Sequence, residues 1–113
     1  FDKLAAAASF TYQNTALCFF GHTHVPVAFI RDSVVRGGTY SKFRLEPGKK
    51  YFVNVGSVGQ SRDGVARATY AIHDMVEGTI ELRRLEYDMA KTQEKILAAG
   101  LPRRLADRLE EGR

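Results

Sequence analysis

The residues best suited to chemistry are two histidines, His22 and His24, which are separated by Thr23 and preceded by Gly21. Neutral imidazole is the commonest protein ligand for transition metals, so this pair is suited to holding metal ions. Glycine permits a sharp turn, which would let both imidazoles project from the end of the preceding strand. A catalytic centre usually takes three or more protein ligands, so the pair is not a complete site. Surface histidines, or a hydrogen-bonded core histidine, stay open as alternatives.

The flanking residues indicate which element would position the pair. Apolar residues 16–20 predict a short buried strand that ends just before the histidines. Pro26 has no N–H to donate and restricts Val25, so strand pairing should not continue unchanged through it. We therefore expect the histidines at a strand-to-loop edge, where open α/β sheets commonly bind ligands.

The remaining pattern predicts an α/β fold that is rich in strands and ends in helices. An alanine-rich helix should pack on the sheet, and two C-terminal helices should cover one of its faces. The second of these helices should begin at Pro102, after Gly100 ends the first in a left-handed cap. The expected helices span residues 2–10, 89–99 and 102 onward; the further strands span 27–30, 40–45, 51–55, 68–72 and 79–85, with the last two forming a hairpin.

Two sequence blocks in a fixed order carry a family resemblance. The sequence GHTHVP occupies residues 21–26, and NVGSVGQSRDG follows about thirty residues later at 54–64. Further matching patterns are ATYAI at 68–72, LEYD at 85–88 and AGLP at 99–102. In this order the chain resembles the C-terminal part of calcineurin-like metallophosphoesterases, especially small bacterial members. The resemblance covers nearly the whole chain.

This resemblance implies a four-layer αββα sandwich, of which residues 1–113 would be the C-terminal portion. It also implies a dinuclear metal centre that hydrolyses phosphomonoesters or phosphodiesters. In that centre His22 would bind one divalent ion and His24 the other. Family members use manganese, iron, zinc or nickel, and the sequence does not choose among them.

The family's other ligand blocks are absent from this sequence. They are an Asp-x-His, a Gly-Asp-x-x-Asp, a Gly-Asn-His followed by Asp or Glu, and a further histidine, all located before the Gly-His-x-His block. The stretch before His22 contains no histidine, and its one carboxylate is Asp2. We therefore expect a fragment that supplies two metal ligands and no catalytic residue. Its expected partners are a phosphate ester and either the missing N-terminal half or a complementary chain, and alone it should be inactive.

The glycine-rich loop at residues 56–64 admits two interpretations. Its backbone N–H groups could cradle a phosphate, but no lysine follows as in a nucleotide P-loop. We expect it to pack beside the histidine loop and shape the site. Within it, Arg62 is a candidate for substrate binding, because guanidinium forms paired hydrogen bonds with phosphate; a local turn with Asp63 is the alternative. His73 lies outside the family's ligand blocks and is expected at the surface.

Composition narrows the function classes. The formal net charge of +4 suits an anionic substrate and is equally ordinary for solubility. No basic block interleaved with aromatic residues indicates a nucleic-acid groove, and no apolar segment approaches a membrane span. The single cysteine, Cys18, has no partner for an internal disulfide, so the cytoplasm is the expected compartment.

Two rival functions follow from the same residues. The first is a non-catalytic, β-rich binding or scaffolding module in which the histidines are vestigial or structural. The second is a single-metal site that another chain completes. An upstream Asp-x-His and Gly-Asn-His in the same gene would favour the enzyme over the module.

Overall fold

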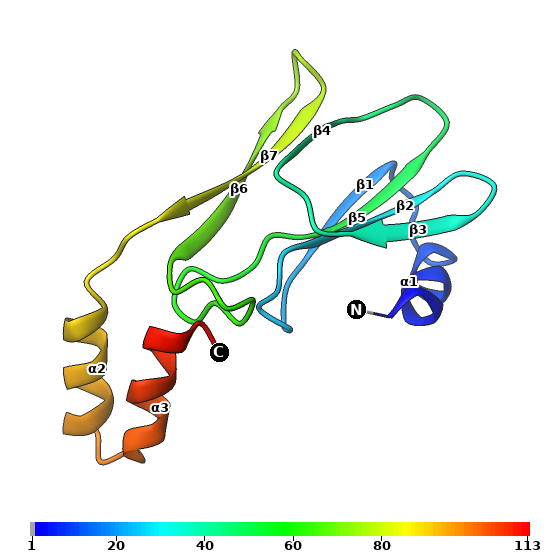
Figure 1. Ribbon diagram of the computed structural model, residues 1–113. Helices are drawn as coiled ribbons and strands as arrows, with labels where there is room; N and C mark the ends of the chain where they lie inside the picture. Colours follow the sequence, from blue (N-terminus) through cyan, green and yellow to red (C-terminus); the bar gives the residue numbers. More distant parts are fainter. Residues whose placement is uncertain (1) are drawn as a thin grey trace.

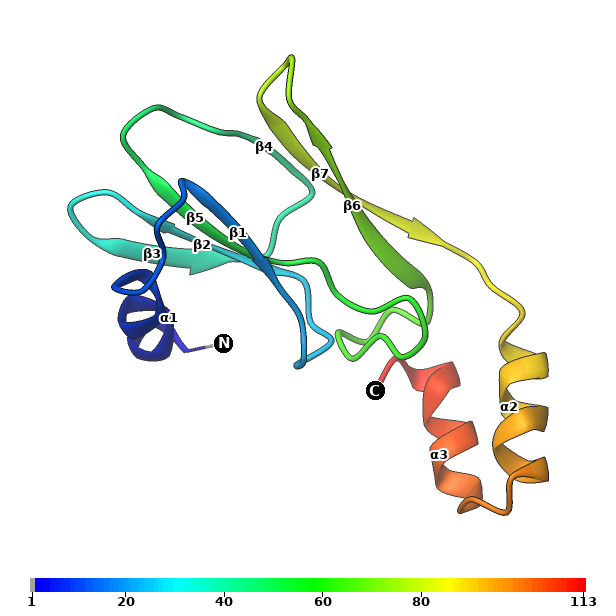
Figure 2. The same cartoon turned by 180° about the vertical axis from the view of Figure 1, so that it is seen from behind.

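The computed structural model describes residues 2–113, which form two β-sheets, one N-terminal helix and a C-terminal helical hairpin (Figures 1 and 2). The four-stranded sheet has the order β1-β5-β2-β3, and the three-stranded sheet has the order β4-β7-β6. The strands are β1 (Leu17–Phe20), β2 (Val27–Arg31), β3 (Val35–Gly38), β4 (Lys42–Arg44), β5 (Lys50–Asn54), β6 (Ala68–Asp74) and β7 (Thr79–Leu85). The helices are α1 (Lys3–Phe10), α2 (Met89–Ala98), α3 (Arg103–Asp107) and the 3₁₀ turn η1 (Arg108–Glu111).

The four-stranded sheet buries both of its faces, and strand alternation explains how. Successive side chains of a strand point to opposite faces. On β2, Val27 and Phe29 pack with Phe10 of α1, whereas on β5, Tyr51 and Val53 pack toward the other sheet. The chain is therefore layered as helix, four-stranded sheet and three-stranded sheet, with a hydrophobic core on each side of the middle layer.

Helix α1 forms where the alanine-rich segment predicted it. Asp2 caps its start, and the Asp2 carboxylate accepts hydrogen bonds from the N–H groups of Leu4 at 2.9 Å and Ala5 at 3.2 Å. Ala6 and Phe10, four residues apart on one side of the helix, are buried against the sheet. The expected packing of this helix on the sheet is confirmed.

Strands β1 and β5 bring the two sequence blocks to one edge of the sheet. They are the parallel pair, and Phe20 at the end of β1 is in register with Asn54 at the end of β5. The loops that follow both strands therefore begin side by side. The strand expected at residues 16–20 forms as β1. Among the described residues it pairs only with β5, and Phe19 is 43% exposed, so the expectation that this strand is buried is wrong.

The C-terminal helices form as predicted but lie elsewhere. Gly100 adopts the expected left-handed conformation, with φ of +75°. Within residues 2–113, however, α2 and α3 pack against each other and against η1, and no strand contacts them. The prediction that they cover a sheet face is wrong. Helix α2 buries no residue completely. The hairpin extends from one end of the molecule (Figure 1).

Two further differences concern strands and shape. Strand β3 was missed because its sequence contains Gly37 and Gly38, and the strand expected at 40–45 is shorter. The radius of gyration is 16.2 Å, larger than the roughly 13 Å of a compact domain of this length. Across the described part of the chain, no helix has the length and apolar character needed to cross a membrane.

Candidate metal centre

The two histidines have an uncommon backbone conformation. His22 has φ of +82° and His24 has φ of +62°, and within residues 2–113 they alone among non-glycine residues have positive φ. The left-handed region costs an L-residue roughly 1–2 kcal/mol. Gly21, where we expected the sharp turn, is not in this region. The chain therefore reverses direction at the two residues that were predicted to bind metal.

Asn54 fixes the residue between them. This side chain is fully buried at the end of β5, and its Nδ2 donates to Thr23 Oγ1 at 2.8 Å and to the Gly21 carbonyl at 3.4 Å. Its Oδ1 accepts from the N–H of Gly56 at 2.9 Å. The buried amide therefore ties the histidine loop to the glycine-rich loop, which the in-register ends of β1 and β5 make possible.

Tyr40 makes a further contact with the end of β5. Its hydroxyl donates to the backbone carbonyl of Asn54 at 2.9 Å. Burial raises the pKa of Tyr40 to about 12, against a smaller opposing effect of Arg84. The hydroxyl is thus protonated at neutral pH and available as a donor.

The ring of His24 is oriented by the glycine-rich loop. Its Nδ1 lies 2.8 Å from the backbone carbonyl oxygen of Gln60. A carbonyl can only accept, so Nδ1 carries the hydrogen and the lone pair of Nε2 remains available for a cation. Metal-binding histidines usually have a partner of this kind on the second nitrogen. The donor chemistry of His24 therefore fits a metal ligand, and His22 is exposed on the same loop.

The glycine-rich loop packs beside the histidine loop, as expected from the sequence. The N–H of Arg62 donates to the carbonyl of His24 at 3.1 Å. At its start, Gly56 has φ of +80°, and a Cβ there would lie 2.0 Å from Thr69 Oγ1. Thr69 in turn accepts a 2.7 Å hydrogen bond from the N–H of Ser57. Only glycine fits this close approach, which holds the loop against β6.

Asp63 serves this loop as a structural anchor. Its carboxylate accepts hydrogen bonds from Arg84 at 2.6 Å, Ser61 at 2.8 Å and the N–H of Val65 at 3.2 Å. Burial alone would raise the pKa of Asp63, but these bonds together hold that pKa below its ordinary value. The side chain of Arg62 does not pair with Asp63 and instead lines a hollow with three other arginines.

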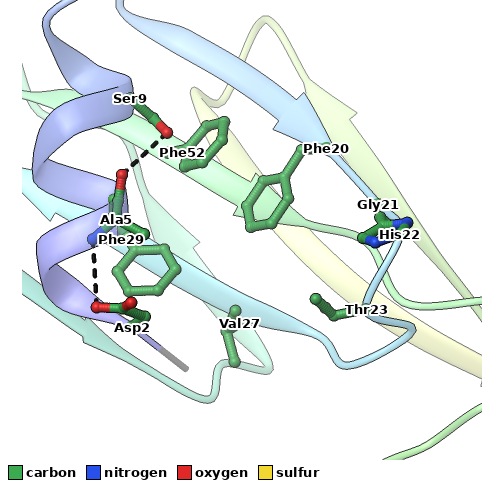
Figure 3. A pocket seen from close by; sticks show the side chains of 11 residues that line it. Asp2, Ala5, Ser9, Phe20, Gly21, His22, Thr23, Val27, Phe29 and Phe52 are labelled. Atoms are coloured by element: carbon green, nitrogen blue, oxygen red, sulfur yellow. Dashed lines mark hydrogen bonds between the residues drawn. The ribbon is translucent and has the colours of Figure 1, made fainter.

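A separate, apolar pocket of about 340 Å³ adjoins the histidine loop. Phe20, Phe29 and Phe52 lie between α1 and the loop, with His22 and Thr23 on the side away from the helix (Figure 3).

No group of three or more histidine, cysteine, aspartate or glutamate side chains that could hold a metal ion occurs among residues 2–113. The described residues thus bring His22 and His24 together on one loop without a third ligand of these types.

His73 and Cys18 have ordinary surroundings. His73 is exposed, as expected, and its ring meets that of Phe19 edge-on at 6.1 Å between centroids. Cys18 is a free, half-buried thiol on β1. The residues that sequence reasoning missed are Asn54 and Gln60 as supports of the histidine loop. Their position within the second sequence block was the available signal.

The fold of this chain matches proteins of the metallophosphoesterase type. A family model described as the calcineurin-like phosphoesterase superfamily domain matches residues 2–78. The chain therefore belongs to the calcineurin-like phosphoesterase superfamily, which confirms the resemblance noted from the sequence.

A solved structure and a relative agree with this assignment. The crystal structure of a metallophosphoesterase from Sphaerobacter thermophilus matches with a TM-score of 0.81 and 36% identity, over 96% of this chain and 48% of that one. It also confirms the fold class, β-rich α/β with C-terminal helices. An uncharacterized protein of Methanocaldococcus jannaschii is 42% identical over 99 residues, which is 86% of this chain and 40% of that protein. The chain thus spans about half or less of the length of both.

Proposed function

We propose that this chain supplies His22 and His24, one to each ion, to a dinuclear metal centre that hydrolyses phosphate esters. The observation that carries the proposal is the left-handed backbone at both histidines, with Thr23 between them fixed by a buried amide. Strain of this kind tends to persist where the surrounding structure enforces it for a function. A core role does not account for it, because His22 is exposed and His24 only half-buried.

Each supporting residue has a defined part in this proposal. The Gln60 carbonyl holds the hydrogen of His24 on Nδ1 and leaves Nε2 free to bind. Asn54 keeps Thr23, and hence both imidazoles, in a fixed arrangement before any ion arrives. When bound, two divalent ions such as manganese, iron, zinc or nickel would supply Lewis-acid activation of the ester. No residue of this chain is assigned to catalysis itself.

The remaining ligands would come from an N-terminal half of the same domain. Support comes from the share of the relatives that the chain spans, 40% and 48%. Within the described residues, one edge of β1 has no partner strand and the apolar pocket beside α1 is open. We propose that the N-terminal half covers both, that the chain is inactive without it, and that the protein acts in the cytoplasm, in keeping with the unpaired Cys18.

The test compares histidine variants of the protein that includes its N-terminal half. His22→Ala and His24→Ala should each lower the metal bound per protein, measured by mass spectrometry of the metal, and reduce hydrolysis of a chromogenic phosphate ester at least about 100-fold. His73→Ala is the matched control and should change neither. Full metal content and activity in both loop variants would reject the proposal and favour the non-catalytic module.

A further inference from the structure

Four arginines, one from the glycine-rich loop and three from the C-terminal stretch, meet at one surface hollow. Arg62, Arg104, Arg108 and Arg113 line an open space of about 410 Å³. Arg62 belongs to the glycine-rich loop, whereas the others belong to α3, η1 and the residue that follows Gly112. Segments about forty residues apart in sequence therefore create a local concentration of positive charge.

A close backbone contact brings these segments together. The N–H of Gly64 donates to the carbonyl of Gly112 at 3.0 Å. Gly112 has φ of +67°, and a Cβ there would lie 2.6 Å from the carbonyl carbon of Gly64. Both conditions require glycine at position 112. The end of the chain is thus docked on the glycine-rich loop, as Figure 2 shows. This docking places Arg62 at the same hollow as the three C-terminal arginines.

The positive charges of the hollow are largely uncompensated. In the described part of the chain Arg113 pairs with Glu111, but Arg62, Arg104 and Arg108 form no ion pair. The other carboxylates of this region have partners elsewhere. Asp107 pairs with Arg103 and Asp63 with Arg84, whereas Glu110 accepts from the neutral amide of Gln93 and forms no ion pair in the described structure. Like charges gathered in this way repel each other, and an anion would relieve the repulsion.

Gln60 connects the hollow to the histidine loop. In the amide orientation that satisfies both groups, its side-chain oxygen accepts from Nε and Nη2 of Arg108, each at 2.8 Å. Its backbone carbonyl is the partner of His24 Nδ1. One residue therefore contacts both an arginine of the hollow and a proposed metal ligand, so the hollow adjoins the proposed centre.

We propose that this hollow binds the second phosphate group of a substrate that carries two or more, that is, a small molecule with an oligophosphate chain. Guanidinium groups match phosphate oxygens in pairs. One phosphate monoester carries about −1.5 to −2 at pH 7, so the three guanidiniums without a carboxylate partner more than balance the charge of one such group. The link to hydrolysis rests on the proposed function, whereas anion binding itself needs no metal.

The test is titration calorimetry of the metal-free protein with tripolyphosphate. We expect one binding site, and Arg104→Gln should weaken binding at least fivefold. Arg104 is the variant of choice because its side chain forms no hydrogen bond or ion pair in the described structure that folding would lose. Arg103→Gln removes the same charge from the same helix, outside the hollow, and should bind as the unaltered protein does. Equal binding by both variants, or none by the unaltered protein, would overturn the inference.

A second variant and a kinetic measurement separate this inference from the proposed function. Arg108→Lys keeps the charge but loses the paired geometry, and it should also weaken tripolyphosphate binding. In the protein with its N-terminal half, Arg104→Gln should raise KM for an oligophosphate substrate more than KM for a simple monoester. If tripolyphosphate binding depends on Arg104 but the protein hydrolyses no phosphate ester, the proposed function is contradicted and this inference stands. If the protein hydrolyses both substrates and Arg104→Gln changes their KM values equally, this inference is contradicted and the proposed function stands.

Discussion

The edge of the four-stranded sheet and the C-terminal hairpin are built in opposite ways. At the sheet edge, Asn54 is fully buried, its amide joins two loops, and the loop residues have conformations fixed by close contacts. In the hairpin, α2 buries no residue completely and touches no strand among the described residues. The difference indicates that positional precision is concentrated around His22 and His24. The hairpin is instead joined to the glycine-rich loop by the backbone contact between Gly64 and Gly112, which places its arginines beside that loop.

The largest expected effect is at Gly56. Gly56→Ala should lower the free energy of unfolding by more than about 2 kcal/mol, because the new Cβ overlaps Thr69 Oγ1 and the backbone has positive φ. Gly59→Ala in the same loop meets no atom within 4 Å and has no positive φ, so it should change stability little. Urea unfolding of both variants measures the difference. Equal losses would show that the loop is not held at Gly56.

A truncation pair compares the two regions directly. Ile80→Ala, in the fully buried core between the sheets, should cost about 2–5 kcal/mol, whereas Leu97→Ala on α2, which is 42% exposed, should cost less than about 1 kcal/mol. The same unfolding experiment reports both values. A cost at Leu97 that matched the cost at Ile80 would mean that the hairpin is as tightly integrated as the sheets.

The smallest effect concerns pH and Asp63. Its pKa is lowered in the folded state, so its contribution to stability is complete above the unfolded value of about 3.9 and is lost as the pH falls through the folded value. The free energy of unfolding should therefore decline below about pH 4, and Asp63→Asn should flatten that decline. Asp32→Asn, at a carboxylate outside this loop whose pKa is also lowered, is the control and should flatten it less. If the free energy of unfolding declined equally with falling pH in all three proteins, Asp63 would not be an anchor of the loop.

Local patterns in the sequence were sufficient for much of the fold. Short apolar runs predicted β2 and β5, two strand-like segments joined by a turn predicted the β6–β7 hairpin, and the alanine run predicted α1, because these signals reside in consecutive residues. The placement of the C-terminal helices was not accessible, since their apolar stripe does not specify which partner it meets. Strand β3 was missed because glycines conceal it.

The candidate site, too, could be predicted only in part from the sequence. The histidine pair and the packing of the glycine-rich loop were accessible from two sequence blocks. The left-handed backbone at His22 and His24 was not, because it depends on Asn54, about thirty residues away in sequence, being in register with Phe20. The partner of His24 at Gln60 likewise depends on that register. Contacts between loops follow from tertiary structure, which no local pattern encodes.

The most direct test of the central claim is a crystal structure of the protein with its N-terminal half, grown with manganese or zinc and measured at the metal's absorption edge. The account predicts two anomalous peaks, one of them about 2.0–2.2 Å from Nε2 of His24 and the other at the same bonding distance from a ring nitrogen of His22. The Gln60 carbonyl should still accept from Nδ1 of His24. Anomalous peaks that lie away from both imidazoles, in a protein that hydrolyses phosphate esters, would contradict the account.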